Sequence, residues 1–156
     1  MSIKFVALDS ETVRRLQNGG VDAYGNEPVR LVSDGGGIPC RHCLRPVAEG
    51  DHYLALAFSP FAKRQPYAET GPIFVHADPC DRAPDSGEPA SMFIFGGQYI
   101  LRGYRDDDWI HYEVAEIVPA DRIAEKADEM LKRNDVSYVH MRSSRYNCYQ
   151  CRIERA

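Results

Sequence analysis

The fold class of this chain depends most on residues 99–133, which read YILRGYRDDDWIHYEVAEIVPADRIAEKADEMLKR. Residues 99–104 and 109–118 are rich in β-branched and aromatic side chains, and the charged residues 105–108 between them suit a hairpin turn. Residues 119–133 carry apolar side chains at helical spacing after an initial proline. The stretch therefore predicts a β-hairpin that leads directly into a helix.

The flanking segments extend this pattern into a sheet. Residues 136–143 and 147–154 are typical of a second hairpin about the turn 144–146. A short helix is expected to begin at residues 9–12. Further strands are expected at residues 3–8, 29–32, 51–58 and 73–76. We therefore expect one α+β domain over residues 1–156, with a mainly antiparallel sheet and one or two covering helices.

The size and composition of the chain narrow its function class. It has 156 residues, of which 44% are hydrophobic, as is typical of one globular domain. The formal net charge of −4 argues against a nucleic-acid partner. The sequence has neither a long apolar run nor a secretory signal at its start, so we expect no membrane partner and a cytoplasmic location. In that reducing compartment, paired cysteines are more often metal ligands or redox thiols than disulfides.

The five cysteines lie in three compact clusters. Cys40 and Cys43 are flanked by glycine and proline residues, which favour a turn that lets both sulfur atoms converge. His76 and Cys80 add an imidazole and a third thiol. Three thiolates and one imidazole suit the tetrahedral coordination of zinc. We therefore predict a zinc site at Cys40, Cys43, His76 and Cys80, and we treat His42 as an ordinary surface or strand residue.

Other uses of these thiols stay open at this stage. Cys40 and Cys43 also have the spacing of a redox pair, and free thiols are a further alternative. A site of four cysteines would join them to Cys148 and Cys151. Side chains three residues apart on a strand point to opposite faces, so a regular strand argues against that site unless a bulge redirects one sulfur atom.

The strand pattern assigns different roles to the last two cysteines. We expect Tyr149, Cys151 and Ile153 to form an apolar face, which makes Cys151 a small core residue. Cys148 belongs to the opposite face with Gln150 and Arg152.

A symmetric turn would add two polar residues to that opposite face. Arg142 would then lie opposite Cys148, and His140 opposite Gln150. Nearby positive charge favours the thiolate form of a cysteine. The catalytic candidates are therefore Cys148 as nucleophile, His140 as proton acceptor and Arg142 as the residue that holds an anionic substrate.

A third group of candidates concerns ligand binding. Residues 59–71 form a long loop, and loops of that length in compact domains are often functional. Tyr67 and Glu69 on this loop, together with Arg152, are the candidate ligand-binding residues. The last 15 residues carry four arginines and a single acidic residue, which leaves positive charge for one anionic small molecule.

Three segments carry a resemblance to a known family. Residues 38–44 (IPCRHCL), residues 66–76 (PYAETGPIFVH) and the closing pair 139–142 (VHMR) and 147–152 (NCYQCR) resemble the bacterial domain-of-unknown-function family 1203 over nearly the whole chain. The resemblance implies no activity, because none is established for that family. It also implies that some members have serine in place of Cys43 and alanine in place of Cys151. A zinc site that uses Cys43 would then not be common to all members, and Cys40 with Cys148 would be the pair to compare.

Two functional hypotheses from different classes follow. The sequence lacks a phosphate-binding loop, a dinucleotide-binding glycine pattern and a nucleophile-elbow serine, so the common enzyme classes are not supported. The first hypothesis is a small zinc-binding module with a binding or regulatory role. The second is a thiol-based enzyme or redox sensor that uses Cys148 on an anionic small molecule.

Overall fold

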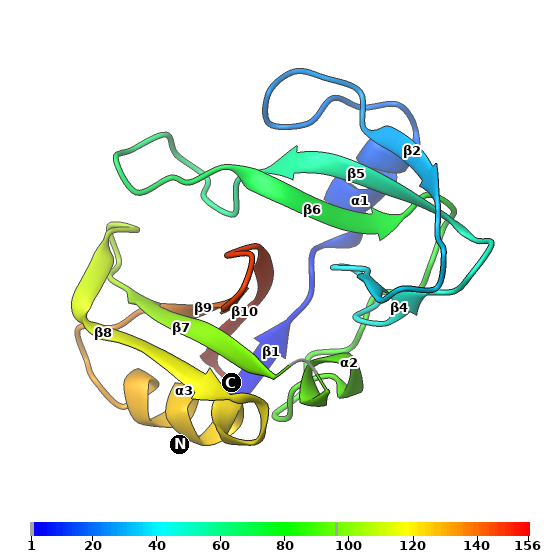
Figure 1. The fold of residues 1–156 in the computed structure, drawn as a ribbon. Coiled ribbons are helices and arrows are strands. Elements are labelled where there is room, and N and C mark those ends of the chain that lie inside the picture. The colour runs from blue at the N-terminus through cyan, green and yellow to red at the C-terminus, as the bar shows by residue number, and fades with distance from the viewer. Residues whose placement is uncertain (1, 96) are drawn as a thin grey trace.

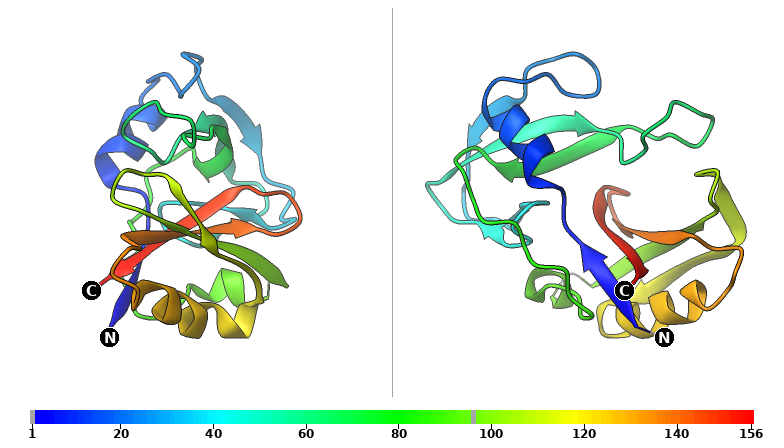
Figure 2. Two further views of the ribbon diagram at one scale, coloured as in Figure 1. Left: turned by 90° about the vertical axis from the view of Figure 1, so that its left-hand side faces the viewer. Right: turned by 180° about the vertical axis from the view of Figure 1, so that it is seen from behind.

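A computed structural model of the chain describes residues 2–95 and 97–156 and confirms an α+β fold built mainly from antiparallel sheets. A five-stranded sheet lies in the lower half of Figure 1 and a three-stranded sheet in the upper half. The chain ends lie close together, because the first strand pairs with the last (Figure 2). The five-stranded sheet has, in spatial order, strands β1 (Ile3–Val6), β10 (Tyr149–Arg155), β9 (Tyr138–Ser143), β7 (Gln98–Tyr104) and β8 (Ile110–Pro119).

The predicted hairpin and helix at residues 99–133 are confirmed. β7 pairs antiparallel with β8, and the N–H of Arg105 donates to the carbonyl of Trp109 across the turn at 3.0 Å. Pro119 precedes a turn of 3-10 helix, η1 (Ala120–Arg122), which continues into α3 (Ile123–Leu131). The proline suits this position because its fixed φ is compatible with a helix start.

Helix α3 covers one face of the five-stranded sheet (Figure 1). Its buried residues pack on the side chains that alternate along the strands. The core on this side of the sheet includes Leu101, Ile123, Leu131, Val139, Met141, Cys151 and Ile153. Among the described residues, none of the helices has the length and apolar character needed to cross a bilayer.

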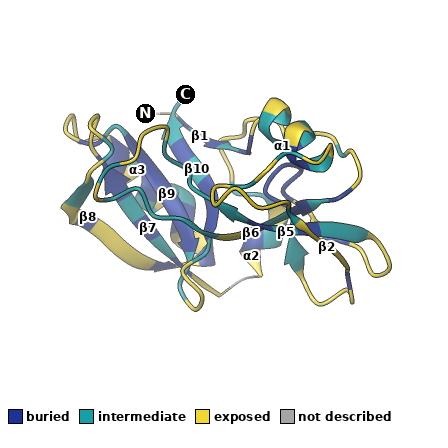
Figure 3. Ribbon diagram, turned by 90° about the horizontal axis from the view of Figure 1, so that it is seen from above, coloured by how far each residue is buried: buried dark blue, intermediate teal, exposed yellow. Residues whose placement is uncertain are grey.

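The three-stranded sheet has a core of its own, on which helix α1 (Ser10–Gln17) packs through Val13 and Leu16. The Asp9 carboxylate accepts the N–H of Thr12 at 2.7 Å, which fixes the predicted start of this helix. Tyr149 from the five-stranded sheet also belongs to this core, so the two halves share buried side chains. Figure 3 shows buried segments, in dark blue, on strands of both sheets. The strands, in spatial order, are β2 (Val29–Val32), β5 (His52–Phe58) and β6 (Gly71–His76).

Smaller elements connect the two sheets. A short ribbon consists of β3 (Ile38–Pro39) and β4 (Pro46–Val47). A single helical turn, α2 (Ser91–Ile94), precedes β7. Residues 59–70 connect β5 to β6, and this loop extends from the upper sheet toward the five-stranded sheet (Figure 1).

The predicted register of the last hairpin is wrong. β9 and β10 pair Arg142 with Tyr149 and His140 with Arg152, and the register shifts between Tyr149 and Cys151. Arg142 therefore does not lie opposite Cys148, and His140 does not lie opposite Gln150. The turn shifts the partner of Arg142 by one residue, and the bulge between Tyr149 and Cys151 adds a second residue to the shift at His140.

The bulge also corrects the predicted apolar face. Cys151 and Ile153 lie in the core beside α3, as expected, whereas Tyr149 lies on the other side of the sheet, in the core beside α1. Its ring centre is 5.0 Å from that of His140. Cys148 lies in the turn before β10, next to Asn147, which has a positive φ of 59°.

Candidate metal centre

The first pair of cysteines lies at the turn of the β3–β4 ribbon. The N–H of Leu44 donates to the carbonyl of Cys40 at 3.0 Å, and the N–H of Cys40 donates to the carbonyl of Arg45 at 3.1 Å. Leu44 adopts a positive φ of 52°, an unusual conformation for a leucine. This tight turn points the side chains of Cys40 and Cys43 to the same side, where the sequence predicted that they would converge.

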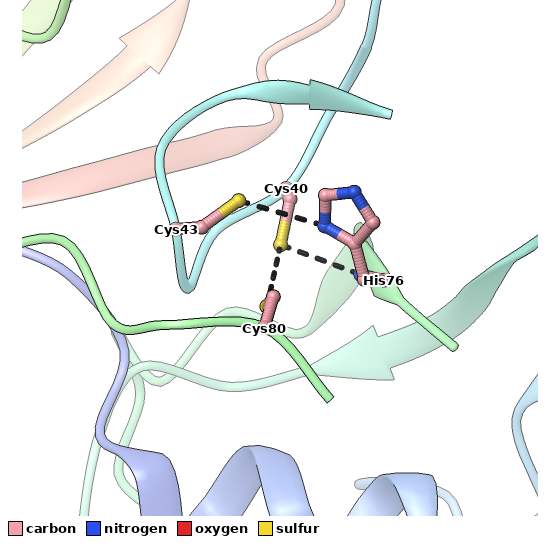
Figure 4. A group of neighbouring side chains, drawn as sticks. All are labelled: Cys40, Cys43, His76 and Cys80. Atoms are coloured by element: carbon pink, nitrogen blue, oxygen red, sulfur yellow. Dashed lines mark hydrogen bonds between the residues drawn. The ribbon is translucent and has the colours of Figure 1, made fainter. Parts of the chain in front are cut away.

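The second pair of ligands comes from β6 and the segment after it. His76 is the last residue of β6, and Cys80 follows in the loop. The predicted ligand atoms of Cys40, Cys43, His76 and Cys80 all lie within 4.8 Å of one another (Figure 4). The proline at 79 disfavours a helix, and the segment converges through a turn instead.

The distances within this cluster fit a tetrahedral metal site. The sulfur atoms of Cys40 and Cys80 are 4.0 Å apart, and the sulfur of Cys43 is 3.5 Å from Nδ1 of His76. Usual zinc bond lengths place two tetrahedral sulfur ligands about 3.8 Å apart, and a sulfur and a nitrogen about 3.6 Å apart. The side chains are therefore already arranged as they would be around one ion.

The protonation of the cluster is asymmetric. Hydrogen bonds from Cys43 and then Cys80 hold the pKa of Cys40 well below its usual range. The hydrogen bond with Cys40 raises the pKa values of both Cys43 and Cys80. The backbone N–H of His76 also donates to the sulfur of Cys40 at 3.3 Å. One thiolate is thus favoured before any ion binds, and a metal would displace protons from the other two sulfurs.

Solvent reaches the cluster from one side. A cavity of about 290 Å³ is lined by Cys43, His76 and Cys80, together with Asp51 and Asp81. Cys40 lies behind them and is fully buried. An ion can therefore enter from the cavity and be held against a buried thiolate.

Arg41, between the two cysteines, is a residue of this centre that the sequence did not reveal. Its side chain is 2% exposed, and it donates to the carbonyls of Tyr149 at 2.8 Å and Pro39 at 2.7 Å. Burial lowers its pKa to about 10, so it stays charged at neutral pH. Among the described residues, no carboxylate forms an ion pair with it. Three thiolates around a divalent ion carry a net negative charge, which would offset this buried cation.

His42 is also buried, and its prediction as a surface or strand residue is wrong. Its Nδ1 is 3.1 Å from the sulfur of Cys80, and its Nε2 is 2.9 Å from the hydroxyl of Ser10. Burial lowers its pKa, which favours the neutral ring. A hydroxyl that donates to Nε2 leaves the proton on Nδ1, where it can be donated to the sulfur. Hydrogen bonds of this kind orient metal ligands.

The backbone of the turn ties distant segments to this centre. The N–H of Leu8 donates to the carbonyl of Arg41, the N–H of Arg41 donates to the carbonyl of Phe74, and the N–H of Ala83 donates to the carbonyl of His42, at 2.8–3.1 Å. These bonds join the turn to the segment before α1, to β6 and to the loop after Cys80. The cluster therefore lies where the two halves of the molecule meet.

The predicted catalytic residues do not form one cluster. His140 is fully buried among aromatic rings, and Arg142 is 4% exposed. The half-buried Cys148 lies in the turn, where its thiol donates to the carbonyl of Tyr146 at 3.7 Å. No contact between Cys148 and His140 is found among the described residues. The catalytic role of these residues stays a prediction.

The three predicted ligand-binding residues, Tyr67, Glu69 and Arg152, contact different partners and do not form one cluster among the described residues. Glu69 contacts Arg142, with 3.3 Å between Oε2 and Nη1. The Tyr67 hydroxyl is 2.7 Å from that of Tyr112 on β8. Arg152 stacks on the ring of Tyr138 and pairs with Glu154 at 2.8 Å. Glu69 is thus the one loop candidate that reaches the predicted arginine.

Cys151 is a core residue. It is fully buried, and burial raises its pKa to about 12. Its thiol donates to the carbonyl of Val6 at 3.4 Å, across the β1–β10 pair. Cys148 and Cys151 therefore do not supply two ligands to one ion, and the alternative site of four cysteines is not formed.

Comparison with known proteins agrees with the family resemblance. Residues 37–155 match the family model described as "Protein of unknown function (DUF1203)". The match covers more than half of the chain and includes Cys40, Cys43, His76 and Cys80, the four residues that could hold a metal ion. The chain belongs to this family. No curated protein and no solved structure matches it.

Proposed function

We propose that this protein is a small zinc-binding module, in which zinc held by Cys40, Cys43, His76 and Cys80 has a structural role. The observation that carries the proposal is the mutual proximity of the four ligand atoms, within 4.8 Å. Three sulfurs and one imidazole favour zinc over harder ions such as magnesium or calcium. Four protein ligands fill a tetrahedral site and leave no open position for a substrate, which is typical of structural zinc.

The role of the metal follows from the position of its ligands. Two ligands come from the β3–β4 turn, and two come from the end of β6 and the loop after it. An ion would cross-link these segments at the junction of the two halves. We infer a binding or regulatory protein of the reducing cytoplasm, in which the metal holds the β3–β4 turn against the end of β6 and the loop after it.

The test is metal analysis of tag-free protein purified without chelators, combined with a thiol count. We expect about one zinc per chain, with the thiols of Cys40, Cys43 and Cys80 reacting only after chelation or denaturation. The core thiol of Cys151 should react only after denaturation. Cys40→Ser should lose the zinc, and the matched variant Cys148→Ser should keep it. Well under one equivalent of metal in the wild type, or equal metal content in the two variants, would refute the site.

A further inference from the structure

A second buried polar cluster lies on the face of the five-stranded sheet away from α3. It consists of Tyr104, His140 and Arg142, which are 0%, 0% and 4% exposed. The hydroxyl of Tyr104, both ring nitrogens of His140, and Nε and Nη2 of Arg142 have no hydrogen-bond partner among the described residues. A buried polar group without a partner is unfavourable, because it has lost its hydrogen bonds to water and gained none in the protein. Several such groups in one place indicate a site built for a ligand.

The cluster has an excess of positive charge. Burial lowers the pKa of His140 well below its usual range, and the nearby guanidinium groups of Arg142, Arg152 and Arg102 lower it further. His140 is therefore neutral. Arg152 is paired with Glu154, whereas Arg102 and Arg142 share a single carboxylate, that of Glu69. The charge balance favours an anionic ligand.

The carboxylate of Glu69 indicates which anion fits. Its Oε1 is 2.9 Å from Nη1 of Arg102, and its Oε2 is 3.3 Å from Nη1 of Arg142. The edge of Arg142 formed by Nε and Nη2 stays unused. Two adjacent N–H groups of a guanidinium match the two oxygens of a carboxylate. Glu69 thus occupies part of the site. The edge of Arg142 formed by Nε and Nη2, which is the better match for a carboxylate, stays free.

Aromatic rings enclose the site. The ring of His140 lies 4.7–5.3 Å, centre to centre, from the rings of Phe61, Tyr104, Tyr138 and Tyr149. Phe61 comes from the loop 59–70, as Glu69 does, and the other three rings belong to the sheet. If the loop moved away, it would take Phe61 and Glu69 with it and expose a space lined by aromatic rings and arginines.

The loop is attached to the sheet below it through side chains. The amide of Gln65 donates to the carbonyl of Asp108 at 3.2 Å, and the ring of Tyr67 packs on that of Trp109 at 4.9 Å. The backbone hydrogen bonds Ala68 to Gln65 and Glu69 to Tyr67 lie within the loop. Partly exposed side-chain contacts of this kind are individually weak. The loop is therefore suited to act as a lid.

We propose that this cluster binds a small organic carboxylate with a flat apolar body, and that Glu69 occupies the site when the ligand is absent. The ligand carboxylate would pair with Arg142 and Arg102 in place of Glu69. Its apolar body would replace Phe61 against the rings of Tyr104 and His140. The proposal is independent of the metal centre, and either can fail without the other.

The test is a titration of the full chain, as purified without chelators, with benzoate, acetate and inorganic phosphate. Trp109 is the sole tryptophan, and its contact with Tyr67 makes its fluorescence a reporter of loop displacement. Calorimetry would measure affinity. We expect benzoate to bind and to change the fluorescence. Glu69→Gln removes the internal competitor and should bind benzoate about tenfold more tightly or better, a difference of about 1.4 kcal/mol. The matched control Glu88→Gln, an exposed glutamate, should behave as the wild type.

Loss of the paired N–H groups of the arginine side chain should abolish the binding of benzoate. Arg142→Lys keeps the charge but not the paired N–H groups, and Arg102→Lys, at a less buried position, is the second variant should the first not fold. Equal benzoate affinity of wild type and Glu69→Gln would overturn the proposal. So would a lack of effect of the lysine substitutions, or no binding by either form up to about 10 mM. Tighter binding of phosphate than of benzoate would overturn the assigned ligand class, and equal affinity for acetate would overturn the apolar body.

Discussion

The two Cys-x-x-Cys pairs of this chain have the same spacing but lie in different backbones. Cys40 and Cys43 occupy a tight turn with a left-handed residue after it, and their sulfurs face a histidine and a third cysteine. Cys148 and Cys151 span the start of a strand, and Cys151 is buried in the core beside α3. The difference shows that backbone geometry, rather than spacing, decides whether two thiols can share an ion.

The residues between the cysteines differ in the same way. Arg41 and His42 are buried polar residues that contact backbone carbonyls and the sulfur of Cys80. Tyr149 and Gln150 are also buried, but Tyr149 belongs to an apolar core. The first pair thus has buried polar neighbours that contact the proposed ligands, whereas Cys151 of the second pair packs in the core.

The largest expected difference between the two pairs is in stability. Removal of zinc by a chelator should lower the free energy of unfolding by about 3 kcal/mol or more, because the cross-link between the β3–β4 turn and the end of β6 is lost. For a chain of this length that corresponds to a fall of about 6–12 °C in Tm. Thermal melts with and without chelator would measure it.

Two variants make this comparison direct. Cys40→Ser should melt near the chelated wild type and show no further response to chelator. Cys148→Ser should stay within about 0.5 kcal/mol of the wild type and keep the full response. The proposed difference between the two cysteine pairs would be contradicted if chelation had the same small effect on the Tm of the wild type, Cys40→Ser and Cys148→Ser.

The fold and part of the metal centre were predictable from the sequence because both depend on local patterns. The hairpin at 99–118 and the helix from 123 follow from alternation, turn residues and helical spacing. The four ligands follow from the chemistry of clustered cysteines and histidine. Each of these patterns lies within a short segment of the chain, so it can be recognised without knowledge of the contacts between distant segments.

Other features depend on contacts between distant segments, which local patterns do not encode. The turn before β10 removed the predicted pairing of Arg142 with Cys148, and the bulge between Tyr149 and Cys151 shifted the register of the last hairpin further. The burial of His42 depends on Ser10 and Cys80, which come from other parts of the chain. The site at His140 and Arg142 depends on Glu69, which reaches them from the loop between β5 and β6.

An intermediate effect is expected at the residue that orients the ligand sulfur. His42→Ala removes the contact with Cys80 and should weaken zinc binding about 10–100-fold, as is usual for hydrogen-bond partners of metal ligands. Competition with a zinc chelator of known affinity would measure the change. His52→Ala is the matched control, because His52 is a half-buried histidine on β5 outside the ligand set. Equal zinc affinity in the two variants would show that His42 only fills space.

The smallest expected effect separates packing from metal binding at the second pair. Cys151→Ala deletes a fully buried sulfur that packs beside α3 and should cost about 1–2 kcal/mol in unfolding free energy, with zinc content unchanged. Cys148→Ala, in the exposed turn, should cost less than about 0.5 kcal/mol. Denaturant unfolding followed by circular dichroism, with zinc measured on the same samples, would give both quantities. Loss of zinc in Cys151→Ala would mean that the two pairs are coupled through the sheet, since Arg41 donates to the carbonyl of Tyr149 two residues before Cys151. Retention of zinc with the expected destabilisation would show that the same spacing supports a ligand pair in one backbone and a packing residue in the other.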